Sequence, residues 1–363
     1  MKKNYIKLLI TIAAAVLLMV TLSFSSFAGV TEDYSYTVLD NGTVRIDRFH
    51  GKGSSVIIPS EIDGKKVTII GSSAFENEYN LTELVIPEGV TTIGEYAFRY
   101  CRALGRLTLP ESLEYIKDEA FQGCYSLKNI NVHENIKGIH HRAFDYTAWY
   151  DSQPAGVVYL GNCLYRYKGN MPEGTSIAVK EGTRSISSYA FSEAKELVSV
   201  TFPESLQYID YGAFSGCNNL RSAGILHNVV SIEDNAFNNC EKLSEIEFKE
   251  GLETIGDNAF SNCKSLKSIN IPKSVKNVEP WAFGGCDSLK TITLSGETNI
   301  YDEAFSGTNI ETLNINGGTL PFEDYGNKSF AMSVRTVNFV EGVTEIGRND
   351  FGLYKNLKAI NLP

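Results

Sequence analysis

The hydrophobic and polar positions of the chain repeat every 23 residues. The pattern is L-x-x-I-x-I-P-x-x-V-x-x-I-G-x-x-A-F-x-x-C-x-x, and residues 81–103 follow it nearly throughout as LTELVIPEGVTTIGEYAFRYCRA. A unit of this size is too small to bury its own apolar residues, so successive units must stack and share one core. The repeat therefore predicts a solenoid. Units that fit the pattern begin at Leu81, Leu104, Leu127, Leu197, Leu220, Leu243, Leu266 and Leu289.

More divergent copies begin near Gly53, Gly174, Ile310 and Val334, which brings the array to about twelve coils. Within a unit, Leu84 and Ile86 alternate with outward residues, as in a short strand that ends at a proline. Ile93 marks a second short extended piece. The apolar spacing i, i+1, i+4 and i+7 from Ala97 fits one or two turns of helix. Stacking about 4.8 Å apart would give a rod or arc about 60 Å long.

One phenylalanine recurs at the same slot of each unit and predicts an apolar spine through the stack. It stands at residues 75, 98, 121, 144, 191, 214, 237, 260, 283, 305 and 351. The small alanine beside it leaves room for the ring. An aromatic column of this kind predicts core packing and not a ligand site.

A cysteine occurs three residues after the spine phenylalanine in six units, at Cys101, Cys124, Cys217, Cys240, Cys263 and Cys286. Neighbours one coil apart are close enough for a disulfide, but their Cβ vectors run parallel, which suits disulfide geometry poorly. The slot is also filled by Thr147 and Ala194, so it requires small size more than sulfur. We expect free, buried thiols here. Cys163 lies off the period and is the cysteine to test for reactivity.

At these residues the chain resembles a known family, the BspA-like (Treponema pallidum type) leucine-rich repeats of bacterial surface proteins. The resemblance covers about residues 53–363 and depends on the phrase I-G-x-x-A-F-x-x-C. It implies a right-handed leucine-rich-repeat arc, with a parallel β-sheet on one face and short strands and helical turns on the other. It also implies bacterial cell-surface adhesion, with host matrix proteins or other cells as partners.

The N-terminus predicts export. Two lysines, an apolar stretch and small residues before Gly29 indicate a signal peptide over 1–28, although an uncleaved anchor is an alternative reading. Its removal takes three lysines and no acid, so the net charge of −10 becomes −13. That charge argues against nucleic acid and an anionic membrane as partners. Residues 29–52 follow as a β-hairpin with a DNG turn that would cap the first coil.

The longest departure from the period is an insertion at about 145–173. Gly161-Asn162 predicts a two-residue hairpin turn within it. Its aromatic side chains either pack back onto the solenoid or form contacts with a partner. The candidate contact residues are Trp149, Tyr150, Tyr159, Tyr165 and Tyr167. A second departure falls within residues 310–333, where the pattern fades.

Catalytic and cofactor motifs are missing from the sequence. It contains no G-x-S-x-G, H-E-x-x-H or Walker phrase, and HENIKGIHH (133–141) would place its histidines on different sides of a coil. We therefore expect no enzyme activity, metal or cofactor. The partial unit at 357–363 would leave an apolar coil end uncovered, so we expect the chain to be a fragment of a longer protein.

The outward residues of the main strands form two columns of small polar side chains. Their candidate contact residues are Thr108, Asn131, Thr201, Asn270 and Thr293. These columns either bind a protein or glycan or merely form solvated ladders. The expected function is that of a monomeric, secreted or cell-surface protein that binds an extracellular protein or glycan without catalysis. The alternatives are a repeat scaffold of a larger extracellular enzyme and a structural spacer of the cell envelope.

Overall fold

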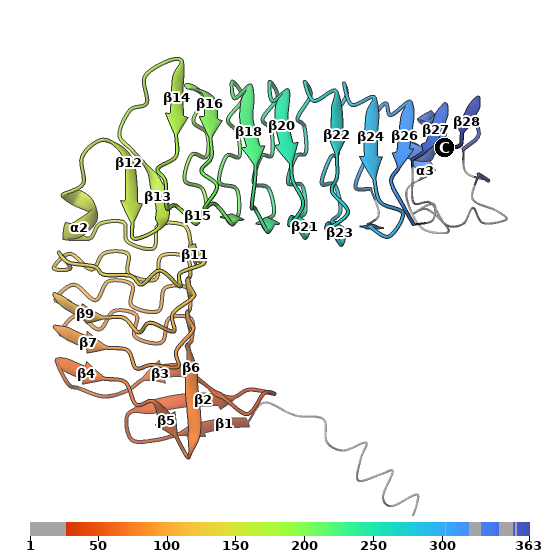
Figure 1. The fold of residues 1–363 in the computed structure, drawn as a ribbon. Helices are drawn as coiled ribbons and strands as arrows, with labels where there is room; N and C mark the ends of the chain where they lie inside the picture. The colour runs from red at the N-terminus through yellow and green to blue at the C-terminus, as the bar shows by residue number, and fades with distance from the viewer. Residues whose placement is uncertain (1–26, 302, 319–327, 341–350, 353) are drawn as a thin grey trace, which may run out of the picture.

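The computed structural model of the chain is a parallel β-solenoid with two straight arms that meet in an L (Figure 1). It describes residues 27–301, 303–318, 328–340, 351–352 and 354–363. The solenoid prediction is confirmed, but the expected arc has a sharp corner at the insertion. The expected signal over 1–28 lies almost entirely outside the described residues, as does part of the second departure.

One set of parallel strands lines the outer side of both arms (Figure 1). In the first arm, these are β4 (Ser55–Ile57), β7 (Glu83–Val85) and β9 (Arg106–Thr108). In the second arm, they are β14 (Thr175–Ala178), β16 (Leu197–Thr201), β18 (Ser222–Leu226), β20 (Glu245–Phe248), β22 (Ser268–Asn270), β24 (Thr291–Leu294), β26 (Thr312–Ile315), β27 (Thr336–Phe339) and β28 (Ala359–Asn361). All of these pair in parallel within three sheets.

The remaining strands form two ladders, and their two-residue members, such as β8 and β17, line the inner side of the L (Figure 1). The first contains β1 (Phe27–Val30), β2 (Tyr34–Val38), β3 (Val44–Phe49), β5 (Glu61–Ile62), β6 (Lys65–Ile70), β8 (Thr92–Ile93), β10 (Tyr115–Ile116) and β11 (Gly138–Ile139). The second contains β12 (Gly156–Leu160), β13 (Cys163–Lys168), β15 (Ser185–Ile186), β17 (Tyr208–Ile209), β19 (Ser231–Ile232), β21 (Thr254–Ile255), β23 (Asn277–Val278) and β25 (Asn299–Ile300). Ile93 opposes Ile116 and Ile209 opposes Ile232, so the 23-residue period sets the register.

The segments around Ala-Phe are turns and not the expected helix. Two residues in most coils have a left-handed backbone, such as Tyr96 with φ 58° and Tyr100 with φ 59°. Because a right-handed helix cannot include such residues, the apolar spacing is met by successive tight turns. The helices of the described residues are α2 (Ala148–Asp151) and α3 (Lys328–Ser333).

The phenylalanine spine is confirmed and is divided at the corner. Ring centroids of successive phenylalanines lie 4.8 to 5.3 Å apart from Phe49 to Phe144 and again from Phe191 to Phe305. Between the two stacks lies the β12–β13 hairpin. Alternate residues of a strand point to opposite sides, so in β13 Tyr165 enters the first core and Leu164 the second. This strand is the partition between the arms.

The cysteines of the repeat lie in the core, as predicted. Each of the six is fully buried, and its thiol donates to the carbonyl of the phenylalanine in the preceding coil, as Cys217 does to Phe191 at 3.0 Å. In the same slot Thr147 donates to the carbonyl of Phe144, within its own coil, at 2.7 Å. The slot therefore accepts small side chains, and those with a donor bond to a phenylalanine carbonyl, whereas Ala194 fills the slot without such a bond.

Candidate partner-binding surface

The Ala-Phe turns of all coils form one side of the solenoid, which we name the turn flank. In the first arm, the residue after the cysteine slot forms a column of Tyr79, Arg102 and Tyr125, one from each successive coil. The two tyrosines are about half exposed, at 51% and 50%. The Arg102 guanidinium lies 5.1 Å from the ring centre of Tyr79 and 6.0 Å from that of Tyr125. The column is thus a cation between two aromatic rings, open to solvent.

Tyr100 is a third ring beside Arg102, whose guanidinium lies 6.0 Å from the ring centre. A Cβ placed on Gly123 in the next coil would stand 2.4 Å from this ring. The glycine therefore provides the space that the ring occupies. The neighbouring Arg99 is different in kind, since it donates to Glu76 at 2.8 Å and to Glu119 at 3.3 Å. Arg99 is neutralised within the protein, whereas no ion pair of the described residues includes Arg102.

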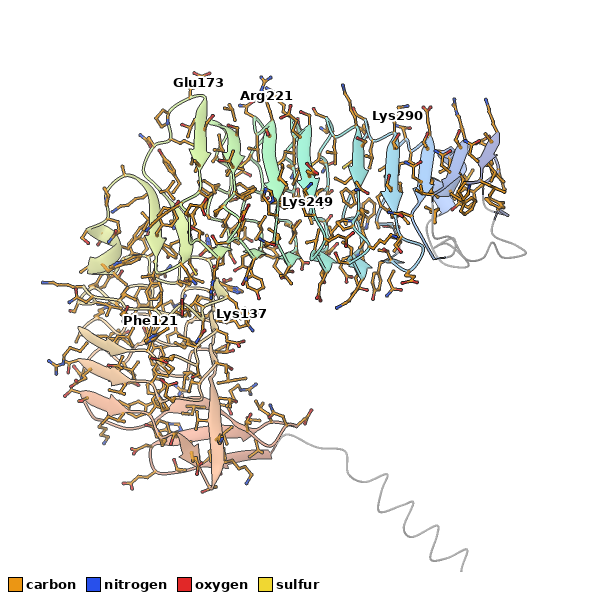
Figure 2. All side chains as sticks on the ribbon, viewed as in Figure 1. Phe121, Lys137, Glu173, Arg221, Lys249 and Lys290 are labelled. Carbon is orange, nitrogen blue, oxygen red and sulfur yellow. The ribbon has the colours of Figure 1, made fainter. Side chains whose placement is uncertain are left out.

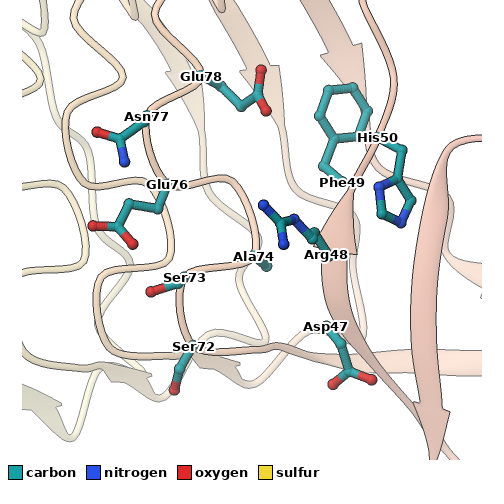
Figure 3. A pocket seen from close by; sticks show the side chains of 10 residues that line it. All are labelled: Asp47, Arg48, Phe49, His50, Ser72, Ser73, Ala74, Glu76, Asn77 and Glu78. Carbon is teal, nitrogen blue, oxygen red and sulfur yellow. The ribbon is translucent and has the colours of Figure 1, made fainter.

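A cavity of about 680 Å³ lies at the N-terminal end of the same flank (Figure 3). Arg48 and Glu78 lie at its centre and edge, and Glu76 is at its wall (Figure 3). Burial raises the pKa of the Glu78 carboxyl, and the charge of Arg48 opposes this shift. The wall residue Glu76 also pairs with Arg99, so the cavity and the Tyr–Arg column are continuous along the first arm.

The aromatic side chains of the insertion mostly pack inward. Trp149 is 9% exposed and Tyr165 2%, and both rings lie 5.9 Å apart in contact with Phe144. Trp149 and Tyr165 are therefore not available for contact with a partner, contrary to expectation, because their rings close the end of the first core. Tyr150, Tyr159 and Tyr167 are half-buried and pack against the same cores.

Cys163, the cysteine that lies off the period, is buried in the first core. Burial raises the pKa of its thiol to about 12, and its sulfur lies 2.8 Å from the Ser185 hydroxyl. It faces the first core because it alternates with Leu164 along β13. Burial and the raised pKa leave little thiolate, so we expect Cys163, the cysteine singled out for a reactivity test, to be unreactive in the folded chain.

The outer polar columns are exposed as expected. Thr108, Asn131, Thr201 and Asn270 are exposed and Thr293 is half-buried. Equivalent positions of these columns bond to one another along the stack. Ser199 donates to Ser176 at 2.7 Å, Asn314 to Thr293 at 3.1 Å and Asn338 to Asn314 at 2.7 Å. Binding by these columns stays a prediction.

The column of Tyr79, Arg102 and Tyr125, here named the Tyr–Arg column, was not predicted from the sequence, although the sequence contains a sign of it. Its members differ in residue type, so the period alone does not mark them. In the second arm the same slot holds Lys195, Asn218, Glu241, Lys264 and Asp287. An aromatic or arginine at a slot that is otherwise plainly polar is the signal to look for.

Two features are not found in the described part of the chain: a cluster of metal-ligating side chains and a helix that could cross a bilayer. There, no three His, Cys, Asp or Glu side chains are arranged to hold a metal ion. Among the same residues, no helix has the length and apolarity to cross a bilayer. The histidines of HENIKGIHH do not gather, since His140 lies at the inner corner and His141 packs on Tyr189, with ring centres 4.7 Å apart.

The BspA type leucine-rich repeat region matches the chain over residues 52–153 and 160–363 in overlapping segments. The chain belongs to this family. Among solved structures, it is similar to a leucine-rich repeat protein from Bacteroides ovatus, with 26% identity over 91% of this chain and 81% of the other and a TM-score of 0.40. No curated protein matches.

Two further solved structures are similar to this BspA-type chain. One is the leucine-rich repeat protein of T. pallidum, with 25% identity over 66% of this chain and 91% of the other and a TM-score of 0.30. The second is a leucine-rich cell surface protein from Faecalibacterium prausnitzii, with 21% identity over 92% of this chain and 98% of the other and a TM-score of 0.34. The family membership confirms the expected repeat class.

Proposed function

We propose that this chain is an exported, non-catalytic binding protein of the bacterial cell surface that attaches to an extracellular protein through the turn flank of its first arm. The observation that supports it is the exposed column of Tyr79, Arg102 and Tyr125. Tyrosine and arginine are enriched at the energetic centres of protein interfaces, because both bury much area and still offer polar contacts.

Charge supports a protein partner with acidic side chains at this surface. Arg102 has no ion pair among the described residues, and the tyrosine rings hold its guanidinium in place. A carboxylate from a partner would form a charge-assisted hydrogen bond with it, shielded by the two rings. The overall negative charge of the chain disfavours acidic partners elsewhere on the molecule, so this column is the place where they fit.

The alternative in which the outer columns bind a glycan has weaker support. Their side-chain hydroxyls and amides already bond to each other along the stack. A ligand would have to replace these bonds. In the Tyr–Arg column the Tyr79 hydroxyl donates to Asn77 at 3.0 Å, but no ion pair of the described residues includes the Arg102 guanidinium. The scaffold and spacer alternatives need no binding surface at all.

The test is surface plasmon resonance of the chain against a panel of immobilised extracellular matrix proteins. We expect the variant with Tyr79→Ala, Arg102→Ala and Tyr125→Ala to lose at least tenfold in affinity, since two or three hot-spot residues contribute that much. The matched control changes Asn218, Glu241 and Lys264 to Ala, which are the same slot in the second arm. A third variant changes Thr108, Thr201 and Asn270 to Ala.

The affinities of the three variants distinguish the Tyr–Arg column from the outer polar columns as the binding surface. Equal losses in the first variant and the matched control would contradict the proposal, as would a loss confined to the outer-column variant. If the folded chain binds no protein of the panel, the spacer function replaces this one. Circular dichroism of every variant establishes that the fold is intact.

A further inference from the structure

A cavity of about 380 Å³ lies on the inner side of the corner, where the two arms meet. The first arm contributes Asp118 and His140 to its lining, and the second contributes Ser188, Tyr189, Asp210, Tyr211 and Glu233. A Cβ added to Gly138 of β11 would stand 3.1 Å from Asp210 Oδ2, so the arms are in direct contact here. Tyr211 and Glu233 are exposed, and the cavity opens to solvent beside them.

Asp210 is the unusual side chain of this cavity. The residue is only 8% exposed, and its Oδ1 accepts a hydrogen bond from the backbone N–H of Tyr211 at 2.8 Å. Its Oδ2 has no hydrogen-bond partner of standard geometry, and neither has the buried hydroxyl of Ser188 in the same lining. The Ser188 hydroxyl is nevertheless close enough to act on the Asp210 carboxylate and lower its pKa, so it satisfies that carboxylate only in part. Native proteins pair almost all buried polar atoms, and those that remain unpaired need an explanation. A ligand that donates hydrogen bonds supplies one.

His140, the neighbouring histidine, does not donate a hydrogen bond to Asp210 Oδ2. Burial and the nearby Lys117 lower the pKa of His140 to about 4, so the ring is neutral at pH 7. Lys117 Nζ lies 3.1 Å from His140 Nε2 and donates to it, which places the ring proton on Nδ1, toward Asp118 at 3.7 Å. Nε2, at 3.6 Å from Asp210 Oδ2, therefore has no proton to offer.

The charges around the cavity favour a cation. Asp118, Asp210 and Glu233 line it, and Lys117 is the one ammonium whose charge acts on Asp210 and Glu233. Lys137, in the inner angle of Figure 2, is already paired with Glu114 at 2.9 Å. Three carboxylates against one ammonium leave an excess of negative charge, and no metal-binding cluster exists among the described residues.

The walls of the cavity favour a flat organic cation. Tyr189 and Tyr211 stand edge to face with ring centres 5.2 Å apart. Aromatic faces attract cations, and guanidinium stacks on them better than ammonium does because it is planar and weakly hydrated. Its five N–H groups also match several acceptors at once, here Asp210 Oδ2, the Ser188 hydroxyl and the carboxylates at the rim.

We propose that the inner-corner cavity binds a guanidinium group, from free arginine or from an arginine side chain of a peptide. Asp210 Oδ2 accepts from the guanidinium, and the exposed ring of Tyr211 offers it an aromatic surface. This site is separate from the Tyr–Arg column, because none of the residues of that column lines it.

The test is isothermal titration of the full chain with N-acetyl-arginine amide at pH 7.5. We expect binding at one site, and at least tenfold weaker binding of N-acetyl-citrulline amide, which has the same shape without the charge. Free arginine and the peptide Gly-Arg-Gly distinguish the two sources: tighter binding of the peptide assigns a peptide ligand, and tighter binding of arginine assigns the free amino acid. Equal affinity for the citrulline probe, or no binding of any arginine probe, would overturn the proposal.

Variants locate the site. Asp210→Asn should weaken binding of N-acetyl-arginine amide at least tenfold, whereas Asp257→Asn, an acid two coils further along the same side, should not. Burial raises the pKa of Asp210 to about 6, so affinity for the probe should fall about tenfold per pH unit below 6 as the proton competes. Thermal unfolding shows that both variants are folded. Full affinity in Asp210→Asn would contradict the assignment.

Discussion

Tyr100 shows at the scale of single residues how the turn flank departs from what the fold alone requires. Its φ of 59° belongs to the left-handed region, where most residues other than glycine cost about 1–2 kcal/mol. Asn239 and Asn262 fill the same slot in the second arm with similar φ values, at lower cost. A large ring at this position is therefore not explained by local stability. Its contact with Arg102 on an exposed surface fits a role in binding.

The buried cysteines of the repeat should resist alkylation in the native chain. Burial raises the pKa of Cys217 and of Cys286 to about 12, so the thiolate that reacts with alkylating reagents is about one part in ten thousand at pH 8. We expect no modification by iodoacetamide in the native chain, as measured by mass spectrometry. In denaturant all seven cysteines should react.

Single residues were predictable from the sequence where the period repeats them. The spine phenylalanines and the six cysteines of the repeat were placed in the core, because an apolar residue that recurs at one slot must face the shared interior. The burial of Cys163 was not predictable in this way, since it lies off the period and its burial depends on which way β13 faces. The cavity at Asp210 was not foreseen, because residues from two arms form it.

At the scale of elements, the β12–β13 hairpin is held by a buried network. Asp145 accepts from the Tyr165 hydroxyl at 3.0 Å and from Arg166 at 2.6 Å, and the same hydroxyl accepts from the backbone N–H of Phe144 at 3.0 Å. The carboxylate thus joins the last coil of the first arm to the strand that divides the cores.

Asp145→Ala should therefore lower the free energy of unfolding by about 3 kcal/mol, because it leaves a buried hydroxyl and a guanidinium without their acceptor. Urea denaturation followed by circular dichroism measures the change. The control is Asp151→Ala, whose exposed side chain lies in the same insertion and should change stability by less than about 0.5 kcal/mol. Equal effects of the two substitutions would show that the network does not fix the hairpin.

Strands were more predictable than turns at this scale. The alternation of apolar residues before each proline correctly indicated short parallel strands, such as β7 ending before Pro87. The helical turns were wrong, because the spacing i, i+4, i+7 is also produced by two tight turns with left-handed residues between them. Periodicity reports which residues face the core, and it does not report the backbone path that brings them there.

At the scale of the whole molecule, the corner separates two cores. The first stack of rings ends at Phe144, the second begins at Phe191, and Trp149 and Tyr165 cover the end of the first. The sequence predicted the inserted hairpin but not the corner. The angle between the arms depends on how one strand packs against both cores, and the repeat pattern contains no information about that packing.

The partition predicts that the arms lose structure separately. In a solenoid each coil contacts only its neighbours, so destabilisation spreads until it meets a weak interface. Phe98→Ala in the first arm and Phe260→Ala in the second each remove a fully buried ring, at a cost of about 3–5 kcal/mol. Hydrogen exchange with mass spectrometry should show faster exchange in the first arm alone for Phe98→Ala and in the second arm alone for Phe260→Ala. Tyr125→Ala, an exposed change, should leave both arms protected. Faster exchange in both arms from either core substitution would mean that β13 couples the two cores instead of dividing them.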